Sequence, residues 1–112
     1  MAVKEVSAAE CKDILAAGAT YLDVRTAEEF EAGHYKDATN IPVMFKESGG
    51  MVKNEGFLDA VSEAFKDKEA SIVVSCKVGK RGGIAAEAMQ GAGYVNVTNM
   101  EGGYDAWLAA GL

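Results

Sequence analysis

The sequence contains few of the residues that build cross-linked or metal-stabilised domains. Its 112 residues include two cysteines, one histidine and one proline. Two cysteines are too few for a disulfide framework or a structural zinc site, and we expect no metal and no organic cofactor. One disulfide between Cys11 and Cys76 stays open, but a chain with an evident apolar core does not need it. The length predicts a single domain over residues 1–112.

Long hydrophobic runs are also missing, and positive charge is scarce. No apolar stretch reaches the roughly 20 residues that a membrane span requires, and residues 1–7 show no signal-peptide pattern. The formal net charge of −6 argues against a general nucleic-acid binder, because such proteins need basic surfaces. We therefore expect a soluble protein without membrane or nucleic-acid partners, in the cytoplasm or, after loss of a transit peptide, the chloroplast stroma.

Helix signals recur along the chain. Capping boxes at Ser7–Glu10 and Thr26–Glu29 predict two helix starts, because each box satisfies free backbone N–H groups. Asn54 is expected to cap a third helix, a fourth should start near Gly82, and a short one is expected over residues 104–108. The apolar helical residues expected to face the core are Cys11, Ile14, Leu15, Phe57, Leu58, Val61, Phe65, Ile84, Ala85, Ala88 and Met89.

Short apolar runs between these helices predict strands. They cover residues 21–24, 39–41, 71–75 and 94–97, and the segment 46–53, with two adjacent glycines, is expected to be a loop. Strands that alternate with helices predict an α/β fold, in which a small, mostly parallel sheet carries helices on both faces.

The segment 75–83 carries the strongest chemical signal. Ligands of such sheets bind at the carboxyl ends of the strands, and Cys76 directly follows the most apolar strand. Backbone N–H groups in a glycine-containing loop and at the start of the next helix favour an anion there. Lys77, Lys80 and Arg81 add three cations within five residues. Together these features favour the thiolate, the form of cysteine that attacks sulfur.

The two cysteines have different settings. A structural cysteine buried at a strand end is the alternative interpretation of Cys76, but the succession of strand, cysteine, cationic glycine loop and helix favours a reactive thiol. Cys11 lies on an apolar helix face with only Lys12 beside it, and we expect it in the core.

Three segments of the chain resemble the signatures of the rhodanese family. They are residues 21–42, the loop 76–81 and residues 102–107, and the overall resemblance extends over nearly the whole chain. The resemblance implies a single-domain rhodanese with the three-layer fold of that family. The segment 49–54 is similar to the corresponding part of short plant and algal members.

Two positions depart from the family pattern. Asp37 stands where glycine is common, and Gly82 stands where Ser or Thr usually follows the arginine of the loop. The second departure removes a possible hydroxyl cap from the following helix, so a less rigid loop is expected.

The resemblance implies a sulfurtransferase that works in two steps. The Cys76 thiolate takes the outer sulfur of thiosulfate, sulfite leaves, and the resulting persulfide passes its sulfur to cyanide or to a low-molecular-weight or protein thiol. A strongly charged loop suits thiosulfate, a dianion, better than mercaptopyruvate. By position, the residues that would bind the donor are Lys77, Val78, Gly79, Lys80 and Arg81.

Other polar and aromatic residues of the signatures have mainly structural interpretations. The resemblance implies that Asp23 and Arg25 pair near a strand end, with substrate contact by Arg25 as the alternative. His34 could act as a general base, but the first step transfers no proton, and its place before a turn favours a structural hydrogen bond. Phe30 and Trp107 are expected to be core aromatics.

Two other functions stay open at this point. An arsenate reductase or phosphatase of the same fold is one, although the four residues between Cys76 and Arg81 make a shorter loop than phosphatase relatives have. A non-enzymatic module that senses persulfide or redox state through Cys76 is the other. Interaction modules of the family typically lack the cysteine, which favours the enzyme.

Overall fold

Strand β6 (Ile72–Ser75) is buried along its whole length because it lies at the centre of a five-stranded sheet. The computed structural model describes residues 3–112. The strand order is β1-β7-β6-β2-β3, and every neighbouring pair is parallel. The predicted parallel α/β sheet is therefore confirmed. The other strands of this sheet are β1 (Lys4–Val6), β2 (Thr20–Asp23), β3 (Thr39–Asn40) and β7 (Val97–Met100).

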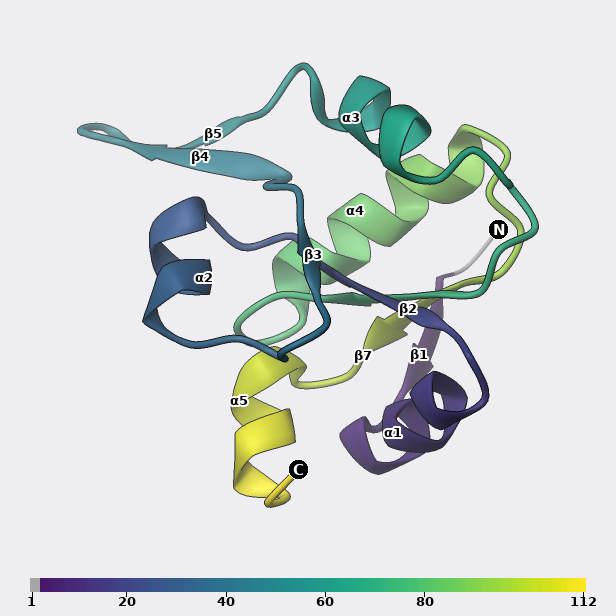
Figure 1. Cartoon of the computed structure of the whole chain (residues 1–112). Helices are drawn as coiled ribbons and strands as arrows, with labels where there is room; N and C mark the ends of the chain where they lie inside the picture. The colour runs from purple at the N-terminus through teal and green to yellow at the C-terminus, as the bar shows by residue number, and fades with distance from the viewer. Residues whose placement is uncertain (1–2) are drawn as a thin grey trace.

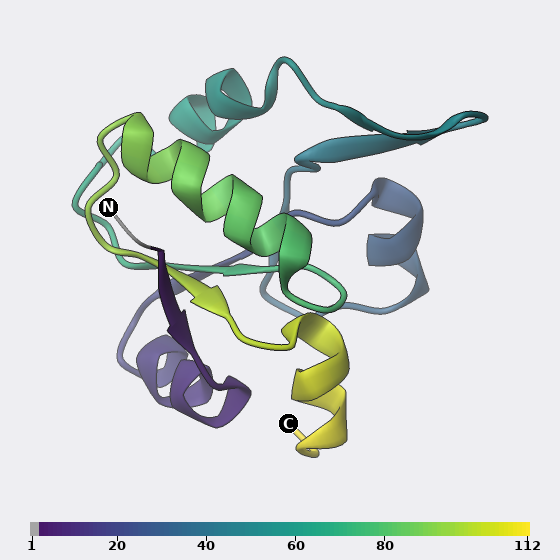
Figure 2. The same cartoon turned by 180° about the vertical axis from the view of Figure 1, so that it is seen from behind.

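Helices cover both faces of this sheet, as Figures 1 and 2 show from opposite sides. Helices α3 (Phe57–Ala64) and α4 (Lys80–Gly91) lie on one face, and α1 (Ala8–Ala16) and α5 (Gly103–Ala109) lie on the other. The short α2 (Ala27–Ala32) lies at the side of the sheet that ends in β3. This is the predicted three-layer arrangement.

Each face of the sheet has its own hydrophobic cluster, because neighbouring residues of a strand point to opposite faces. Ile72 and Val74 of β6 join the cluster beneath α3 and α4, whereas Val73 joins the cluster beneath α1 and α5. Trp107 lies in the second cluster with Cys11, so both were placed correctly in the core.

The helix starts follow the sequence signals in part. At Thr26 the side chain accepts the Glu29 backbone N–H and the Glu29 carboxylate accepts the Thr26 N–H, which confirms a complete capping box. Ser7 also accepts the backbone N–H of Glu10, but the Glu10 carboxylate bonds to the Ser7 hydroxyl, not to its backbone. The expected cap at Asn54 was wrong: α3 begins after Gly56, and Asn54 accepts the Gly56 N–H within the preceding turn.

Two other element predictions were wrong, and one helix starts slightly earlier than expected. The expected loop 46–53 is an antiparallel hairpin of β4 (Met44–Glu47) and β5 (Gly50–Lys53), which projects from the body in Figure 1. The last strand lies at Val97–Met100, not at 94–97. Its position was missed because Thr98 and Asn99 are polar, although they pair with strands on both sides. Helix α4 begins at Lys80, two residues before the expected start near Gly82, because Gly79 turns the chain into it with φ 104°.

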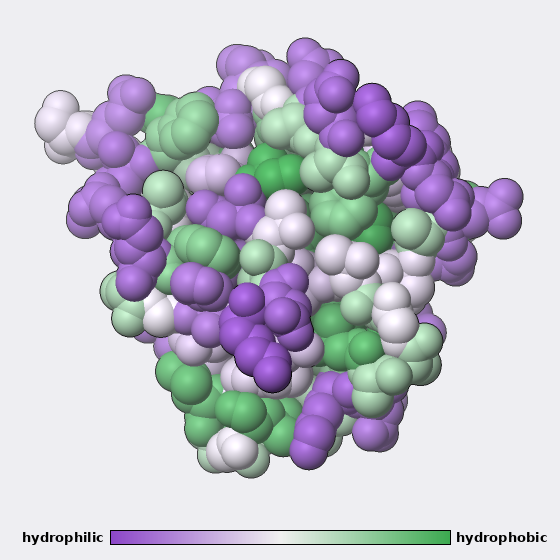
Figure 3. Space-filling view, in the orientation of Figure 1, coloured by the Kyte–Doolittle hydropathy of each residue, from purple (hydrophilic) through white to green (hydrophobic). Residues whose placement is uncertain are grey.

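Some residues expected in the core are exposed. Leu58 is 39% exposed and Ile84 46%, and both line a cavity between α3 and α4. Phe30 is only partly buried on α2 and stacks on His34. Hydrophilic residues cover much of the face in Figure 3, and apolar ones gather near α5 and near the hairpin. Within residues 3–112, no helix has the length and apolar character needed to cross a membrane.

Candidate active site

Cys76 lies at the carboxyl tip of the central strand β6, where the chain turns into α4. The residue is 1% exposed, and its Sγ accepts the backbone N–H of Gly79 at 3.0 Å. Gly79 can direct its N–H inward because its φ of 104° is in the left-handed region, which glycine adopts without steric cost. The loop between Cys76 and Lys80 therefore bends around the sulfur.

The start of α4 contributes further donors to this loop. Backbone N–H groups in the first turn of a helix have no intrahelical acceptor, and here they belong to residues 80–82. The positive end of the helix dipole lies at the same place. The predicted order of strand, loop and helix is present, and such an arrangement suits an anion at the tip of β6.

The loop is held from the opposite side by the start of α5. The backbone N–H of Tyr104 donates to the Cys76 carbonyl at 2.7 Å, and that of Asp105 donates to the Lys77 carbonyl at 3.0 Å. A Cβ on Gly103 would lie 2.4 Å from the Cys76 carbonyl oxygen. Glycine is thus required at this position for close approach, which gives a physical reason for the Gly-Gly pair of the C-terminal signature.

Arg81 is bound to a carboxylate outside the loop. Its guanidinium donates to both oxygens of Glu29 on α2, at 2.7 and 2.9 Å. Hydrogen bonds from Arg81, aided by those from Thr26, lower the pKa of Glu29 from 4.5 to about 2. The same bonds raise the pKa of Arg81. The predicted donor-binding cation is therefore neutralised in this structure by Glu29.

The other predicted loop residues point outward. Lys77 pairs with Asp105 at 2.9 Å, and both side chains are at least half exposed. Val78 is 59% exposed. Lys80 is exposed and makes no ion pair with any residue in the described range. Of the predicted set, Gly79 alone has a hydrogen bond to Sγ.

Asp23 and Arg25 form a buried pair at the end of β2. The Arg25 guanidinium donates to both carboxylate oxygens of Asp23, at 2.7 to 3.1 Å, and to the Gly33 carbonyl at 2.7 Å. Its carbon Cζ lies 4.6 Å from the centre of the Tyr104 ring. Burial lowers the pKa of Arg25, but the contacts with Asp23 outweigh it and the net shift is upward. Through Tyr104, this pair supports the backbone that holds Cys76.

His34 and Cys11 lie away from the loop. The His34 Nδ1 is 2.6 Å from the Phe30 carbonyl oxygen, at the end of α2. Cys11 is fully buried, and this burial raises the pKa of its thiol to about 11. The two cysteines are both free, so the single disulfide is not formed.

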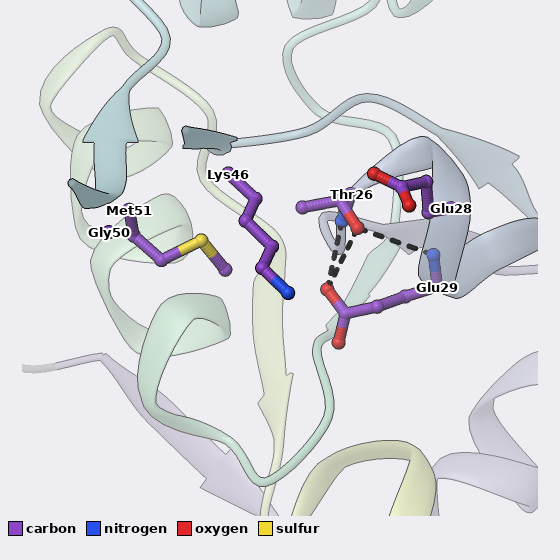
Figure 4. A pocket seen from close by; sticks show the side chains of 6 residues that line it. All are labelled: Thr26, Glu28, Glu29, Lys46, Gly50 and Met51. Carbon is purple, nitrogen blue, oxygen red and sulfur yellow. Dashed lines mark hydrogen bonds between the residues drawn. The ribbon is translucent and has the colours of Figure 1, made fainter. Parts of the chain in front are cut away.

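A cavity of about 460 Å³ lies between α2 and the hairpin. Figure 4 shows the amine of Lys46 and the carboxylate of Glu29 pointing into it from opposite walls. Met51 lines the hairpin side. Glu29 lines this cavity and also binds Arg81, so the Glu29–Arg81 ion pair connects the cavity with the loop that follows Cys76. No group of three or more His, Cys, Asp or Glu side chains that could hold a metal occurs in residues 3–112.

Comparison with known proteins shows to which family the chain belongs. The rhodanese-like domain matches residues 7–110. The chain belongs to the rhodanese family. The rhodanese-like domain of the Alr3790 protein from Anabaena has a TM-score of 0.76 at 25% identity, covering 96% of this chain and 74% of that one. The family and the fold predicted from the signatures are both confirmed.

Short plant rhodaneses are among the similar sequences. Thiosulfate sulfurtransferase 16, chloroplastic, from Arabidopsis thaliana is 43% identical over 96% of this chain and 88% of its own length. The human thiosulfate:glutathione sulfurtransferase is 38% identical over 92% and 91%. The Arabidopsis protein HIGH ARSENIC CONTENT 1, mitochondrial, is 44% identical over 98% of this chain. The chain spans only 64% of the length of that last relative.

Sequence reasoning missed the partners of the loop. Glu29 was assigned only to a capping box, and Asp105 and Tyr104 only to a signature. Nothing in the spacing along the chain shows that they meet residues 76–81. Asn99, which contacts the Gly79 carbonyl at 3.0 Å, was missed because it falls beyond the strand that was predicted.

Proposed function

We propose that this rhodanese is a thiosulfate sulfurtransferase in which Cys76 carries the transferred sulfur as a persulfide. The observation that carries the proposal is the hydrogen bond from the Gly79 N–H to Cys76 Sγ, 3.0 Å long, at the tip of β6. A donor aimed at sulfur stabilises negative charge on it. Relatives named as thiosulfate sulfurtransferases, one of them 43% identical, support the same activity.

The reaction needs no proton transfer in its first step. The Cys76 thiolate attacks the outer sulfur of thiosulfate, a new S–S bond forms, and the old S–S bond breaks with its electron pair leaving on sulfite. The acceptor, cyanide or a thiolate, then attacks the outer sulfur of the persulfide and releases the Cys76 thiolate. Free N–H groups of the first turn of α4 would stabilise the anionic outer sulfur between the two steps.

Access to the sulfur requires the loop to respond to the donor. Cys76 is 1% exposed, so thiosulfate would reach Sγ only after a local movement of the groups that cover it. Lys80 is exposed and would meet the dianion first. Arg81 would join when the donor displaces the Glu29 carboxylate, exchanging one anionic partner for another.

The acceptor is proposed to be a low-molecular-weight thiol, with cyanide as a surrogate in assays. Support comes from the human relative, whose name specifies thiosulfate and glutathione. Lys46 and Glu29 line the neighbouring cavity of about 460 Å³ with charges of opposite sign. Such a surface suits a small zwitterionic thiol. We propose the cytoplasm or the chloroplast stroma as the compartment. One similar plant protein is named as chloroplastic, which supports the second of these.

Intact-mass spectrometry tests the proposal directly. Reduced protein mixed with thiosulfate should gain the mass of one sulfur atom, and a thiol acceptor should remove it. Cys76→Ser should abolish the gain, whereas the matched Cys11→Ala should keep it, because Cys11 lies in the core. An unchanged mass in the wild type, or a gain that survives Cys76→Ser, would contradict the proposal. Arsenate serves as the comparison substrate, because the name of one relative refers to arsenic.

A further inference from the structure

The side chain of Asn99 lies behind the active-site loop. It is fully buried on β7, and its amide nitrogen donates to the Gly79 carbonyl at 3.0 Å. The same nitrogen donates to both carboxylate oxygens of Glu5 on β1, at 2.9 and 3.0 Å. Gly79 is the residue whose own N–H reaches Cys76 Sγ. Asn99 therefore holds, from behind, the residue that donates to the sulfur.

Gly79 needs such a restraint. Its φ of 104° lies in the left-handed region, and glycine populates several backbone conformations with similar ease. Its carbonyl accepts the Gly83 N–H of α4 at 3.0 Å, which ties the residue to the helix, and further contacts are needed to keep its own N–H directed at Sγ. The bond from Asn99 to its carbonyl is a contact of this kind.

The position of Asn99 depends in turn on Gly82. A Cβ on Gly82 would lie 2.2 Å from the Asn99 side-chain oxygen, a distance that real Cβ contacts do not show. That oxygen is buried and has no hydrogen-bond partner. The amide cannot rotate to relieve the clash, since its nitrogen is fixed by Glu5 and Gly79. This pairing accounts for glycine at a position where the family usually has Ser or Thr.

We propose that Asn99 is a positioning residue for Cys76, acting through Gly79, and that Gly82 is the residue that makes room for it. Only the expected effect on kcat rests on the proposed sulfur transfer. The structural part, that Asn99 keeps the Gly79 N–H on the sulfur, stands by itself. Gly82 is thus a replacement coupled to Asn99 and not a missing helix cap, since it lies inside the first turn of α4.

Two measurements on the full chain test the proposal. The first is hydrogen exchange of the Gly79 amide by NMR, which reports its bond to Sγ. The second is the pair of kinetic constants kcat and KM for thiosulfate. Asn99→Ala should raise the Gly79 exchange rate about tenfold and lower kcat by a similar factor, with KM changed less than about twofold, as expected for loss of one buried hydrogen bond. The matched control is Val97→Ala, which truncates a buried residue at the start of the same strand, paired with Ile72 at the end of β6 away from Cys76.

The coupling gives a second, independent comparison. Gly82→Ala should reproduce the effects of Asn99→Ala, and the double variant should be no worse than Asn99→Ala alone, because the Cβ then enters space that the amide has left. Gly83→Ala is the control for glycine replacement in the helix, since a Cβ there meets nothing closer than 3.7 Å.

Several results would overturn the proposal. One is a Gly79 exchange rate in Asn99→Ala no different from that in Val97→Ala. Another is full additivity in the double variant. If Asn99→Ala does not fold, the exchange rate of the Gly79 amide is compared between Gly82→Ala and Gly83→Ala. Equal rates in these two variants would contradict the proposal. A wild type that takes no sulfur from thiosulfate would defeat the proposed function, while the exchange measurement would still decide the role of Asn99.

Discussion

The backbone N–H of Tyr104 donates a hydrogen bond to the carbonyl oxygen of Cys76 at 2.7 Å. The loop that follows β6 is therefore anchored to the first turn of α5 through backbone atoms. The contact is possible because Gly103 has no side chain and a φ of 61°.

Replacing Gly103 with alanine should damage the loop more than the fold. Its Cβ would lie 2.4 Å from the Cys76 carbonyl oxygen and 2.7 Å from the Lys77 carbonyl oxygen, and backbone atoms cannot move aside easily. We expect Gly103→Ala to lower kcat/KM for thiosulfate at least about tenfold and stability by about 1–3 kcal/mol. Gly111→Ala is the matched control: its φ is 75°, but a Cβ there meets no atom within 4 Å. Equal activity in the two variants would contradict this account.

Replacing Glu29 with glutamine should release Arg81. At neutral pH the change removes the anionic partner of the guanidinium, so we expect stability to fall by about 1.5–3 kcal/mol. If Glu29 competes with the donor for Arg81, KM for thiosulfate should fall at the same time. Glu28→Gln, on the same turn of α2 but exposed, should change neither quantity. A raised KM in Glu29→Gln would argue that the pair holds the loop in its active form instead.

The stability contributed by the Glu29–Arg81 pair should depend on pH in a defined window. The pKa of Glu29 is about 2 in the folded protein against an ordinary value of 4.5, so the folded state favours the ionised carboxylate. The stabilisation is complete above about pH 4.5 and is lost as the pH falls toward 2. Urea unfolding of wild type and Glu29→Gln should therefore converge at low pH. A difference that stays constant down to pH 2 would contradict the assignment.

Breaking the buried Asp23–Arg25 pair should be among the most destabilising single changes. Arg25→Met leaves the Asp23 carboxylate buried without its cation, and we expect a loss of about 3–5 kcal/mol in the free energy of unfolding. The exposed Lys66–Glu63 pair provides the comparison, since Lys66→Met should cost less than about 1 kcal/mol. A double variant that also carries Asp23→Leu should recover part of the loss, because no charge is then left unpaired. A small effect of Arg25→Met would show that water reaches this carboxylate.

Cys11 should not react with alkylating reagents in the native protein. Its thiol is buried and its pKa is raised to about 11, so almost none is thiolate near pH 8. In Cys76→Ser, where Cys11 is the remaining cysteine, iodoacetamide should add no mass until guanidinium unfolds the chain. Labelling of the folded variant at the rate of a free thiol would show that α1 opens readily.

Local signals predicted the elements that local chemistry determines. The apolar run at 72–75 became the central strand, and the capping box at Thr26 formed as expected. The hairpin was missed because the adjacent glycines at 49 and 50 outweighed the weakly apolar flanks. Strand β7 was misplaced because Asn99 is a polar residue whose burial depends on Glu5 and Gly79, far away in the chain.

In the candidate site, too, features set by consecutive residues could be predicted, whereas contacts with distant residues could not. The order of strand, Cys76, glycine loop and helix could be predicted from the sequence, since these residues are consecutive. The behaviour of the loop cations could not. Arg81 and Lys77 bind Glu29 and Asp105, which approach only after the sheet and the outer helices have assembled.

The register of the sheet also bears on how the protein is made. Strand β1 pairs with β7, so β1 can complete its pairing only after a segment far later in the sequence has been synthesised. Tyr104 is later still, and it holds the Cys76 carbonyl. A nascent chain on the ribosome can thus display Cys76 well before it can enclose it. During this interval the thiol lies in an unfinished sheet, because the backbone N–H that binds the Cys76 carbonyl has not yet been placed.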